Sequence, residues 1–258
     1  MGSTELIRGM LERCSSEETV FPPTILYNEG WMLRLVLEWF SQRSISEHPL
    51  CFPNKAKWYS EALLPSAFLA RYRGDKYAEA WTHADGVIGH FQIGRDRDGD
   101  LTLLADATTF KVVEAKMFSK LSAGTTHARY YNQAARNIAC IAEVLNRAGK
   151  KPSELQCLAF YVVAPRLAID GGVFDKYMSA ESVKSTVKKR AEEYDESKSN
   201  WFEEWFLPTL IRIDIQTISW EDILSYVTEM DSLSALELKK FYERCKKYNR
   251  STSTRIAT

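Results

Sequence analysis

One stretch of the chain is apolar at almost every position, and it constrains the fold more than any other feature. It is LQCLAFYVVAP, at residues 155–165. Successive side chains of a β-strand point to opposite faces of its sheet, so a strand that is apolar on both faces has to be buried on both. A second stretch, FKVVEAKM at 110–117, is mainly apolar on both faces too. We therefore expect two buried strands, with 110–117 at the centre of a sheet.

Length and charge restrict the class of protein further. The 258 residues suit a single large domain, with a core at about 24–165, additions at about 166–248 and a tail at 249–258. Lysine plus arginine (34) balances aspartate plus glutamate (34), which argues against a histone-like nucleic-acid binder but allows a local basic groove. The N-terminus has no apolar signal core and no stretch approaches a membrane span. We expect a soluble cytoplasmic protein with no membrane partner.

The patterns along the chain indicate an α/β protein. The elements expected in the core are a helix from a Thr24 cap to about Ser41, strands at 86–94, 101–105 and 110–117, a helix at 127–148 that ends before Gly149, and the strand at 155–165. This order of helix, three strands, helix and strand predicts a mixed, partly antiparallel central sheet.

The remaining segments are expected to add to this core. Residues 44–75 look irregular, and 95–100 (RDRDGD) has the composition of a turn. After the core we expect a helix at about 174–196, a strand at 210–219 and two extra C-terminal helices.

One face of the mainly apolar strand at 110–117 carries two charged residues near its end. Glu114 and Lys116 share a face with Phe110 and Val112, because residues two apart in a strand lie on the same side. An uncompensated charge in apolar surroundings is costly, so the carboxylate needs a partner. A partly buried Glu–Lys ion pair is the simplest explanation of this pattern.

A third charged residue, Asp85, opens the strand expected at 86–94. Neighbouring strands can place Asp85 beside Glu114, and two carboxylates at such a point repel each other unless a cation lies between them. The histidines and cysteines show no zinc-binding spacing, and oxygen ligands favour Mg²⁺ or Mn²⁺. Lys116 could then orient or deprotonate a water, or stabilise charge on a phosphate. These are the parts that phosphodiester hydrolysis requires.

Other polar residues fall on helix faces that are otherwise apolar. Gln133 lies on the inner face of the second helix of the core, where an amide needs partners. It either contributes to the site or caps strand ends, and the sequence does not decide between the two. Glu29 lies on the buried face of the first helix, where a carboxylate requires a basic partner or a metal, with Glu61 as the alternative acid. His83 is expected to be structural.

Asp85, the E-A-K sequence at 114–116 and a following helix with Gln133 resemble the PD-(D/E)XK nuclease superfamily, which has the restriction-endonuclease-like fold. The resemblance covers residues 24–165 and includes the order of the elements. Ala84 stands where the family has a proline. The tyrosine that follows the glutamine in exonuclease-like branches is missing from its usual place, which separates this chain from those branches.

The resemblance implies a nuclease that depends on Mg²⁺ or Mn²⁺. In the family the acids of the motif bind the metal, a glutamate on the first core helix assists, and the lysine supports the attacking water. Carried over to this sequence, the metal ligands are Asp85, Glu114 and Glu29, and the catalytic residues are Lys116 and Gln133. DNA is favoured over RNA as the substrate.

Two arginines on or before the Gln133 helix, Arg129 and Arg136, are placed to meet phosphates of the nucleic acid. The sequence leaves the oligomeric state open, a homodimer included. It also leaves two other functions open. One is a catalytically inactive binding or assembly protein that keeps the nuclease fold, and the other is a metal-dependent hydrolase of a nucleotide or another phosphate ester.

Overall fold

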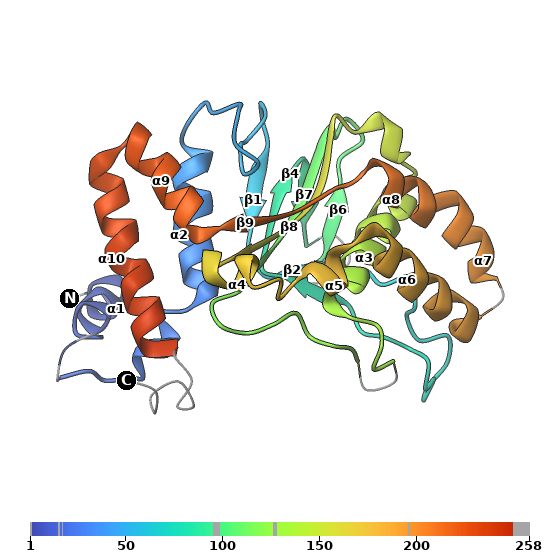
Figure 1. Cartoon of the computed structure of the whole chain (residues 1–258), viewed down its shortest axis with the longest axis horizontal. Helices are drawn as coiled ribbons and strands as arrows, with labels where there is room; N and C mark the ends of the chain where they lie inside the picture. Colours follow the sequence, from blue (N-terminus) through green and yellow to red (C-terminus); the bar gives the residue numbers. More distant parts are fainter. Residues whose placement is uncertain are drawn as a thin grey trace.

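A five-stranded mixed sheet runs through the centre of the molecule (Figure 1). The computed structural model describes residues 2–14, 16, 18–94, 99–125, 128–195 and 197–249. In spatial order the strands of the sheet are β1 (Lys57–Tyr59), β4 (Gly86–Gly89), β7 (Thr109–Ala115), β8 (Cys157–Ala164) and β9 (Asp214–Ser219). β1, β4 and β7 pair antiparallel, whereas β7, β8 and β9 pair parallel. The predicted α/β class with a mixed central sheet is confirmed.

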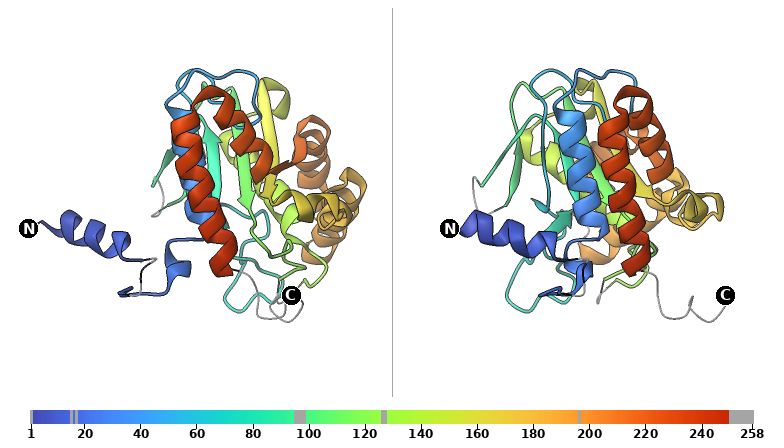
Figure 2. Two further views of the ribbon diagram at one scale, coloured as in Figure 1. Left: turned by 60° about the vertical axis from the view of Figure 1, so that its left-hand side comes forward. Right: turned by 90° about the vertical axis from the view of Figure 1, so that its left-hand side faces the viewer.

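Helices cover both faces of this sheet, on the left and right of Figure 1. α2 (Glu29–Ser41), α9 (Trp220–Met230) and α10 (Ser232–Asn249) form one layer, where they lie side by side (Figure 2). α3 (Gln133–Ala148) and α6 (Ala180–Tyr194) form the other. Shorter helices accompany them: α4 (Arg166–Asp170), α5 (Asp175–Met178), α7 (Lys198–Trp201) and α8 (Leu207–Arg212). The expectation of two terminal helices is confirmed.

The side chains of β7 alternate between the two layers. Phe110 and Val112 belong to the apolar cluster that includes α3, while Val113 and Ala115 belong to the cluster that includes α2. β8 alternates in the same way, so both strands are buried on both faces, as the apolar runs predicted. Glu114 follows Phe110 and Val112 on the α3 face, which is the face that the two-residue period assigns to it.

Two helices start later than predicted. Thr24 lies in a 3₁₀ turn (Pro23–Ile25), and α2 begins at Glu29 because the Asn28 side chain accepts a hydrogen bond from the Trp31 N–H at 2.9 Å. α3 begins at Gln133 rather than 127, since the Asn132 side chain caps it. His127 itself lies outside the described residues. The predicted end of α3 is confirmed, with Gly149 in the left-handed conformation at φ 61°.

The strand predictions needed three corrections. The segment 86–94 is split into β4 and β5 (Phe91–Ile93), and β5 pairs with β6 (Leu101–Leu103) in a separate two-stranded sheet. The segment at 44–75 contains β1 and also β2 (Ala62–Leu64), which pairs with β3 (Thr82–Ala84). The first residues of the strand predicted at 210–219 belong to α8. Residues 95–98 of the expected turn and 250–258 of the expected tail lie outside the described residues.

The N-terminal helix α1 (Ser3–Glu12) extends away from the body and buries none of its residues (Figure 2). Within the described part of the chain, no helix is both long and apolar enough to cross a membrane.

Gly89 is where the chain leaves the central sheet for the small one. A Cβ atom at this position would lie 2.3 Å from the main-chain oxygen of Thr109 and 3.1 Å from the Cα of Phe110. Backbone cannot move aside as the end of a flexible side chain can, so only glycine fits where β4 passes β7. This close approach keeps the two strands in register at the opposite end, where the charged residues lie.

We predict that Gly89→Ala lowers the free energy of unfolding by about 1–3 kcal/mol, because the added methyl group forces β4 away from β7. Urea unfolding measures the change. Gly9→Ala is the matched control, since a Cβ at Gly9, within α1, meets nothing within 4 Å. Equal stability of the two variants would contradict the packing described for Gly89.

Candidate active site

The antiparallel pairing of β4 with β7 brings Asp85 and Glu114 together. Gly86 pairs with Val113, so Asp85, the residue before β4, comes opposite Glu114, the next residue of β7. The Asp85 Oδ2 atom accepts a hydrogen bond from the Ala115 N–H at 2.8 Å, which ties it to the same end of β7. The structure therefore places the two acids side by side, as the sequence predicted.

Glu114 is held by three side-chain donors. Its Oε1 accepts hydrogen bonds from Lys116 Nζ and Gln133 Nε2, both at 2.6 Å, and its Oε2 accepts one from Asn137 Nδ2 at 3.3 Å. The Glu114 side chain is only 2% exposed, and that of Lys116 is 11% exposed. The Glu–Lys pair and the Gln133 hydrogen bond to Glu114 are both present, and the Gln133 Oε1 atom also accepts a hydrogen bond from the Ser122 N–H at 3.1 Å, so Gln133 holds the segment after β7 as well.

Asn137 is the site residue that the sequence analysis did not assign. It lies one helical turn after Gln133, and residues four apart on a helix share a face. Two amides at this spacing on an apolar helix face are the signal that could have identified it. Asn137 is fully buried, and its Oδ1 atom has no hydrogen-bond partner among the described residues.

Burial and the charges of two neighbouring residues shift the pKa of Glu114. Desolvation is the largest effect, and together with the negative charge of Asp85 it raises the pKa of Glu114 to about 8, although Lys116 pulls the value down. The lysine therefore compensates only part of the negative charge at this point. A perturbed carboxylate with a specific charged neighbour is typical of functional sites.

Lys116 is fixed by its main chain as well as by Glu114. Its N–H donates to the Val163 carbonyl on β8 at 2.8 Å, and its carbonyl accepts a hydrogen bond from the Trp220 indole on α9 at 2.9 Å. The residue after the end of β7 is thus attached to a neighbouring strand and to the opposite helical layer. This anchorage limits the positions that the ammonium group can reach.

Glu29 is not joined to the acidic pair by any contact between described residues. It is the first residue of α2, half-buried, and its carboxylate acts on the Cys245 thiol of α10, whose pKa is raised mainly by burial. Glu61, the alternative acid, is brought opposite Asp85 by the pairing of β2 with β3, because Ala62 pairs with Ala84. Glu61 itself contacts Arg34 at 3.3 Å and His83 at 3.9 Å.

The two arginines proposed to meet phosphate differ in position. Arg129 is exposed, while Arg136 is half-buried on α3 and lines a pocket that also includes His83. Neither arginine donates to Glu114.

The donor set suits a hard divalent cation with few protein ligands. No group of three or more His, Cys, Asp or Glu side chains in the described part of the chain is arranged to hold a metal ion. Mg²⁺, however, is commonly bound by one or two carboxylates and completes its shell with waters and substrate oxygens. Asp85 and Glu114 offer such a pair, with excess negative charge, and the unpartnered Asn137 oxygen lies beside them. These residues fit Mg²⁺ or Mn²⁺.

A search of protein-family models, of curated proteins and of solved structures found no match to this chain.

Glu114 should make the stability of the protein depend on pH. Its pKa is about 8 in the folded chain against an ordinary value of 4.5, so the folded state holds the proton more tightly. The stability that this proton contributes is fully present below pH 4.5 and is lost as the pH rises through 8. Glu114→Gln cannot ionise, so the variant should gain stability relative to the native chain between pH 5 and pH 9. Urea unfolding at several pH values measures this, and a constant difference would contradict the assignment.

Proposed function

We propose that this chain is a divalent-metal-dependent nuclease, in which Asp85 and Glu114 bind Mg²⁺ or Mn²⁺ and Lys116 assists the attack of water on a phosphodiester bond. The observation that carries the proposal is the buried Glu114 carboxylate, which receives hydrogen bonds from Lys116 and Gln133 and lies next to Asp85. A second carboxylate beside an ion pair repels the first and weakens the pair. A purely structural Glu–Lys pair would therefore not need Asp85 next to it.

The ligands come from two neighbouring strands. Glu114 lies near the end of β7, and Asp85 immediately precedes β4. Gln133 and Asn137 hold the Glu114 carboxylate from α3 and thereby fix its direction, as residues that surround a metal ligand commonly do. A bound cation would neutralise the two carboxylates, draw phosphate oxygens to the site and lower the pKa of a coordinated water. Glu29 has no contact with this group, and we do not include it among the proposed ligands.

Lys116 acts in its charged form in this proposal. An ammonium group has three donors and no acceptor, so it cannot take the proton of the attacking water. It can donate hydrogen bonds to that water and to the phosphate oxygens that gain negative charge as the reaction proceeds. The water oxygen forms the new bond to phosphorus and loses its proton to solvent, while the bond from phosphorus to the leaving oxygen breaks and the leaving oxygen takes a proton from solvent. Gln133 positions Glu114 for this step.

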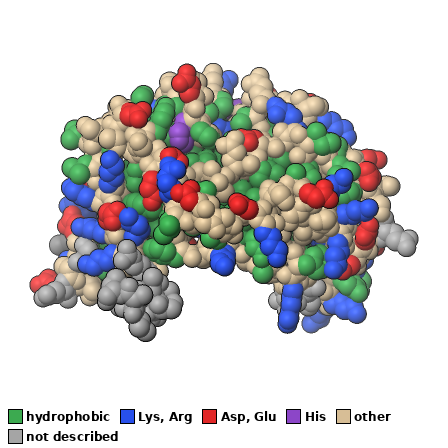
Figure 3. Space-filling view, in the orientation of Figure 1, with side chains coloured by type: hydrophobic (Ala, Val, Ile, Leu, Met, Phe, Trp, Pro, Cys, Tyr) green, Lys and Arg blue, Asp and Glu red, His purple; other side chains and the backbone are tan. Residues whose placement is uncertain are grey.

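Nucleic acid is the substrate that agrees with the resemblance of Asp85, the E-A-K sequence at 114–116 and Gln133 to the PD-(D/E)XK nucleases. Acidic and basic side chains are interspersed over the face in Figure 3, and the net charge of the chain is zero. Attraction of a polynucleotide would then depend on local groups at the site rather than on a broad basic surface.

We predict that Lys116→Ala reduces Mg²⁺-dependent cleavage by about 10²–10³-fold, because it removes a donor to the transition state. The protein should stay folded, since Glu114 keeps Gln133 and Asn137 as partners and can bind a proton. Gel assays with single- and double-stranded DNA and RNA, in Mg²⁺ and in Mn²⁺, measure the effect. Circular dichroism checks the fold.

Lys120→Ala is the matched control for this assay. Lys120 is exposed and lies four residues further along the chain, so its loss should leave cleavage unchanged. Full activity of Lys116→Ala would contradict the mechanism. Cleavage of none of the four polynucleotides by the native chain would contradict the proposed substrate. Hydrolysis of bis(p-nitrophenyl) phosphate alone would assign the same residues to a hydrolase of small phosphate esters.

A further inference from the structure

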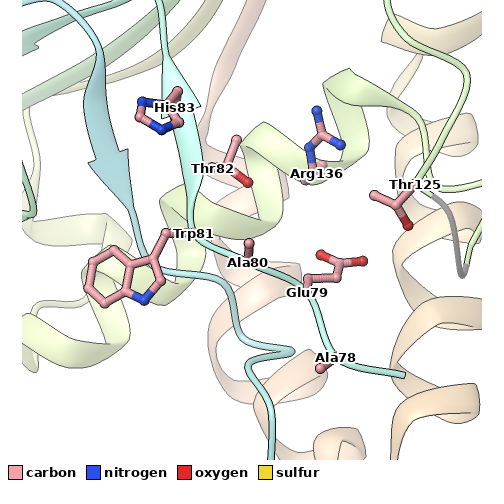
Figure 4. Close-up of a pocket in the computed structure, with 8 residues that line it drawn as sticks. All are labelled: Ala78, Glu79, Ala80, Trp81, Thr82, His83, Thr125 and Arg136. Carbon is pink, nitrogen blue, oxygen red and sulfur yellow. The ribbon is translucent and has the colours of Figure 1, made fainter. Parts of the chain in front are cut away.

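A pocket of about 520 Å³ lies between the segment that leads into β3 and the first turns of α3 (Figure 4). Its lining includes the polar or charged residues Glu79, Thr82, His83, Thr125 and Arg136. Two of its lining residues lie close in the chain to residues of the proposed active site. His83 comes two residues before Asp85, and Arg136 immediately precedes Asn137, which donates to Glu114. A volume of this size lies within the range of small-molecule sites.

Arg136 brings a positive charge into this pocket, and this charge acts on the Glu79 carboxylate, whose pKa it pulls down against the effect of burial. Its Nε atom is buried and makes no hydrogen bond to any described residue, and no ion pair joins its guanidinium to a described carboxylate. A buried donor without a partner is costly, and a guanidinium has five donors to satisfy. The side chain rises from α3 on the wall of the pocket (Figure 4).

Glu79, the acid that lines this pocket, is already paired with Arg190. The Glu79 Oε1 atom accepts a hydrogen bond from Arg190 Nε at 2.9 Å, and its Oε2 accepts one from the Ser66 hydroxyl at 3.3 Å. The Glu79 and Arg190 side chains are 4% and 1% exposed, so the two form a neutral buried pair. One carboxylate thus faces two guanidinium groups, those of Arg190 and Arg136, which leaves one positive charge in excess among these three residues.

We propose that this pocket is an anion subsite that binds a phosphate group on the Arg136 guanidinium. The planar fork of a guanidinium matches two phosphate oxygens at once, which a lysine cannot do. That the phosphate belongs to a polynucleotide, next to the bond that is cleaved, rests on the proposed function. The anion subsite itself rests only on the pocket and on the unpaired charge.

Binding without cleavage tests this subsite separately from the nuclease mechanism. Fluorescence anisotropy in EDTA would compare short single-stranded DNAs that carry a 5′-phosphate, a 3′-phosphate or no terminal phosphate, with inorganic phosphate as competitor. Arg136→Gln should weaken binding by about tenfold or more, as expected for the loss of charged hydrogen bonds. Arg136→Lys should keep part of the affinity, because it keeps the charge but not the fork.

Arg8→Gln is the matched control, since Arg8 is exposed on α1, which buries none of its residues, and its loss should leave affinity within about twofold of the native chain. If Arg136→Gln removes only the affinity added by a terminal phosphate, the ligand is a strand end. If it weakens all three DNAs equally, the ligand is an internal phosphodiester, and both outcomes support the subsite.

The contradicting result is equal affinity of Arg136→Gln and the native chain for every probe, inorganic phosphate included. A thermal melt guards against misfolding of the variant, because phosphate should raise the Tm of the native chain and not that of Arg136→Gln. Lys116→Ala should keep phosphate binding in full. Failure of the nuclease proposal with intact Arg136-dependent binding would therefore leave the subsite standing.

Discussion

The burial of one carboxylate, that of Glu114, governs the arrangement of the elements around it. A charge inside a sheet can be kept only if donors reach it from every side, and here they come from the end of β7 and the start of α3. α3 begins at Gln133, after the Asn132 cap, and Asn137 lies one turn later. This start places both amides where they can donate to Glu114. Lys116 in turn is held through its main chain by β8 and α9, so both helical layers contribute to the placement of a single acid.

The donors do not neutralise the site completely. Asp85 adds a second negative charge beside Glu114, and Lys116 supplies one positive charge. The excess can be relieved by a proton on Glu114 or by a cation shared between the two acids. Arg136, one residue before Asn137 on α3, forms no ion pair with a described carboxylate and leaves one positive charge in excess beside the Glu79–Arg190 pair. A negative site next to a positive one suits a phosphodiester with its counter-cation, and this complementarity links the proposed nuclease site to the proposed subsite.

The sequence predicted the parts of the site that depend on local periodicity. The two-residue alternation of β7 placed Glu114 on a buried face, and the position of Asp85 at the start of a strand placed it at the same edge. Features that depend on side-chain caps or on contacts between distant segments were not predicted. The Asn28 cap moved the start of α2 and left Glu29 at a helix end instead of among apolar neighbours. The split at Gly89 arises from the approach of two backbones, which leaves no periodic signal in the sequence.

Glu29 and Asn137 show the same difference between local periodicity and tertiary contacts. Glu29 looked like a site residue because helical spacing was extended across residues that are not helical. Asn137 was not assigned to the site, because its contact with Glu114 exists only once α3 packs on β7. Local pattern thus identified the charged residues, and tertiary packing decided which of them meet.

Calorimetric titration of Mn²⁺ into the native chain, Asp85→Asn and Asp106→Asn tests most directly whether the acidic pair is a cation site. Asp106 is exposed, so its replacement controls for the loss of one negative charge. The account predicts saturable binding by the native chain and by Asp106→Asn, and a loss of affinity of about tenfold or more in Asp85→Asn. Undetectable binding to the native chain, or equal binding by all three proteins, would contradict it.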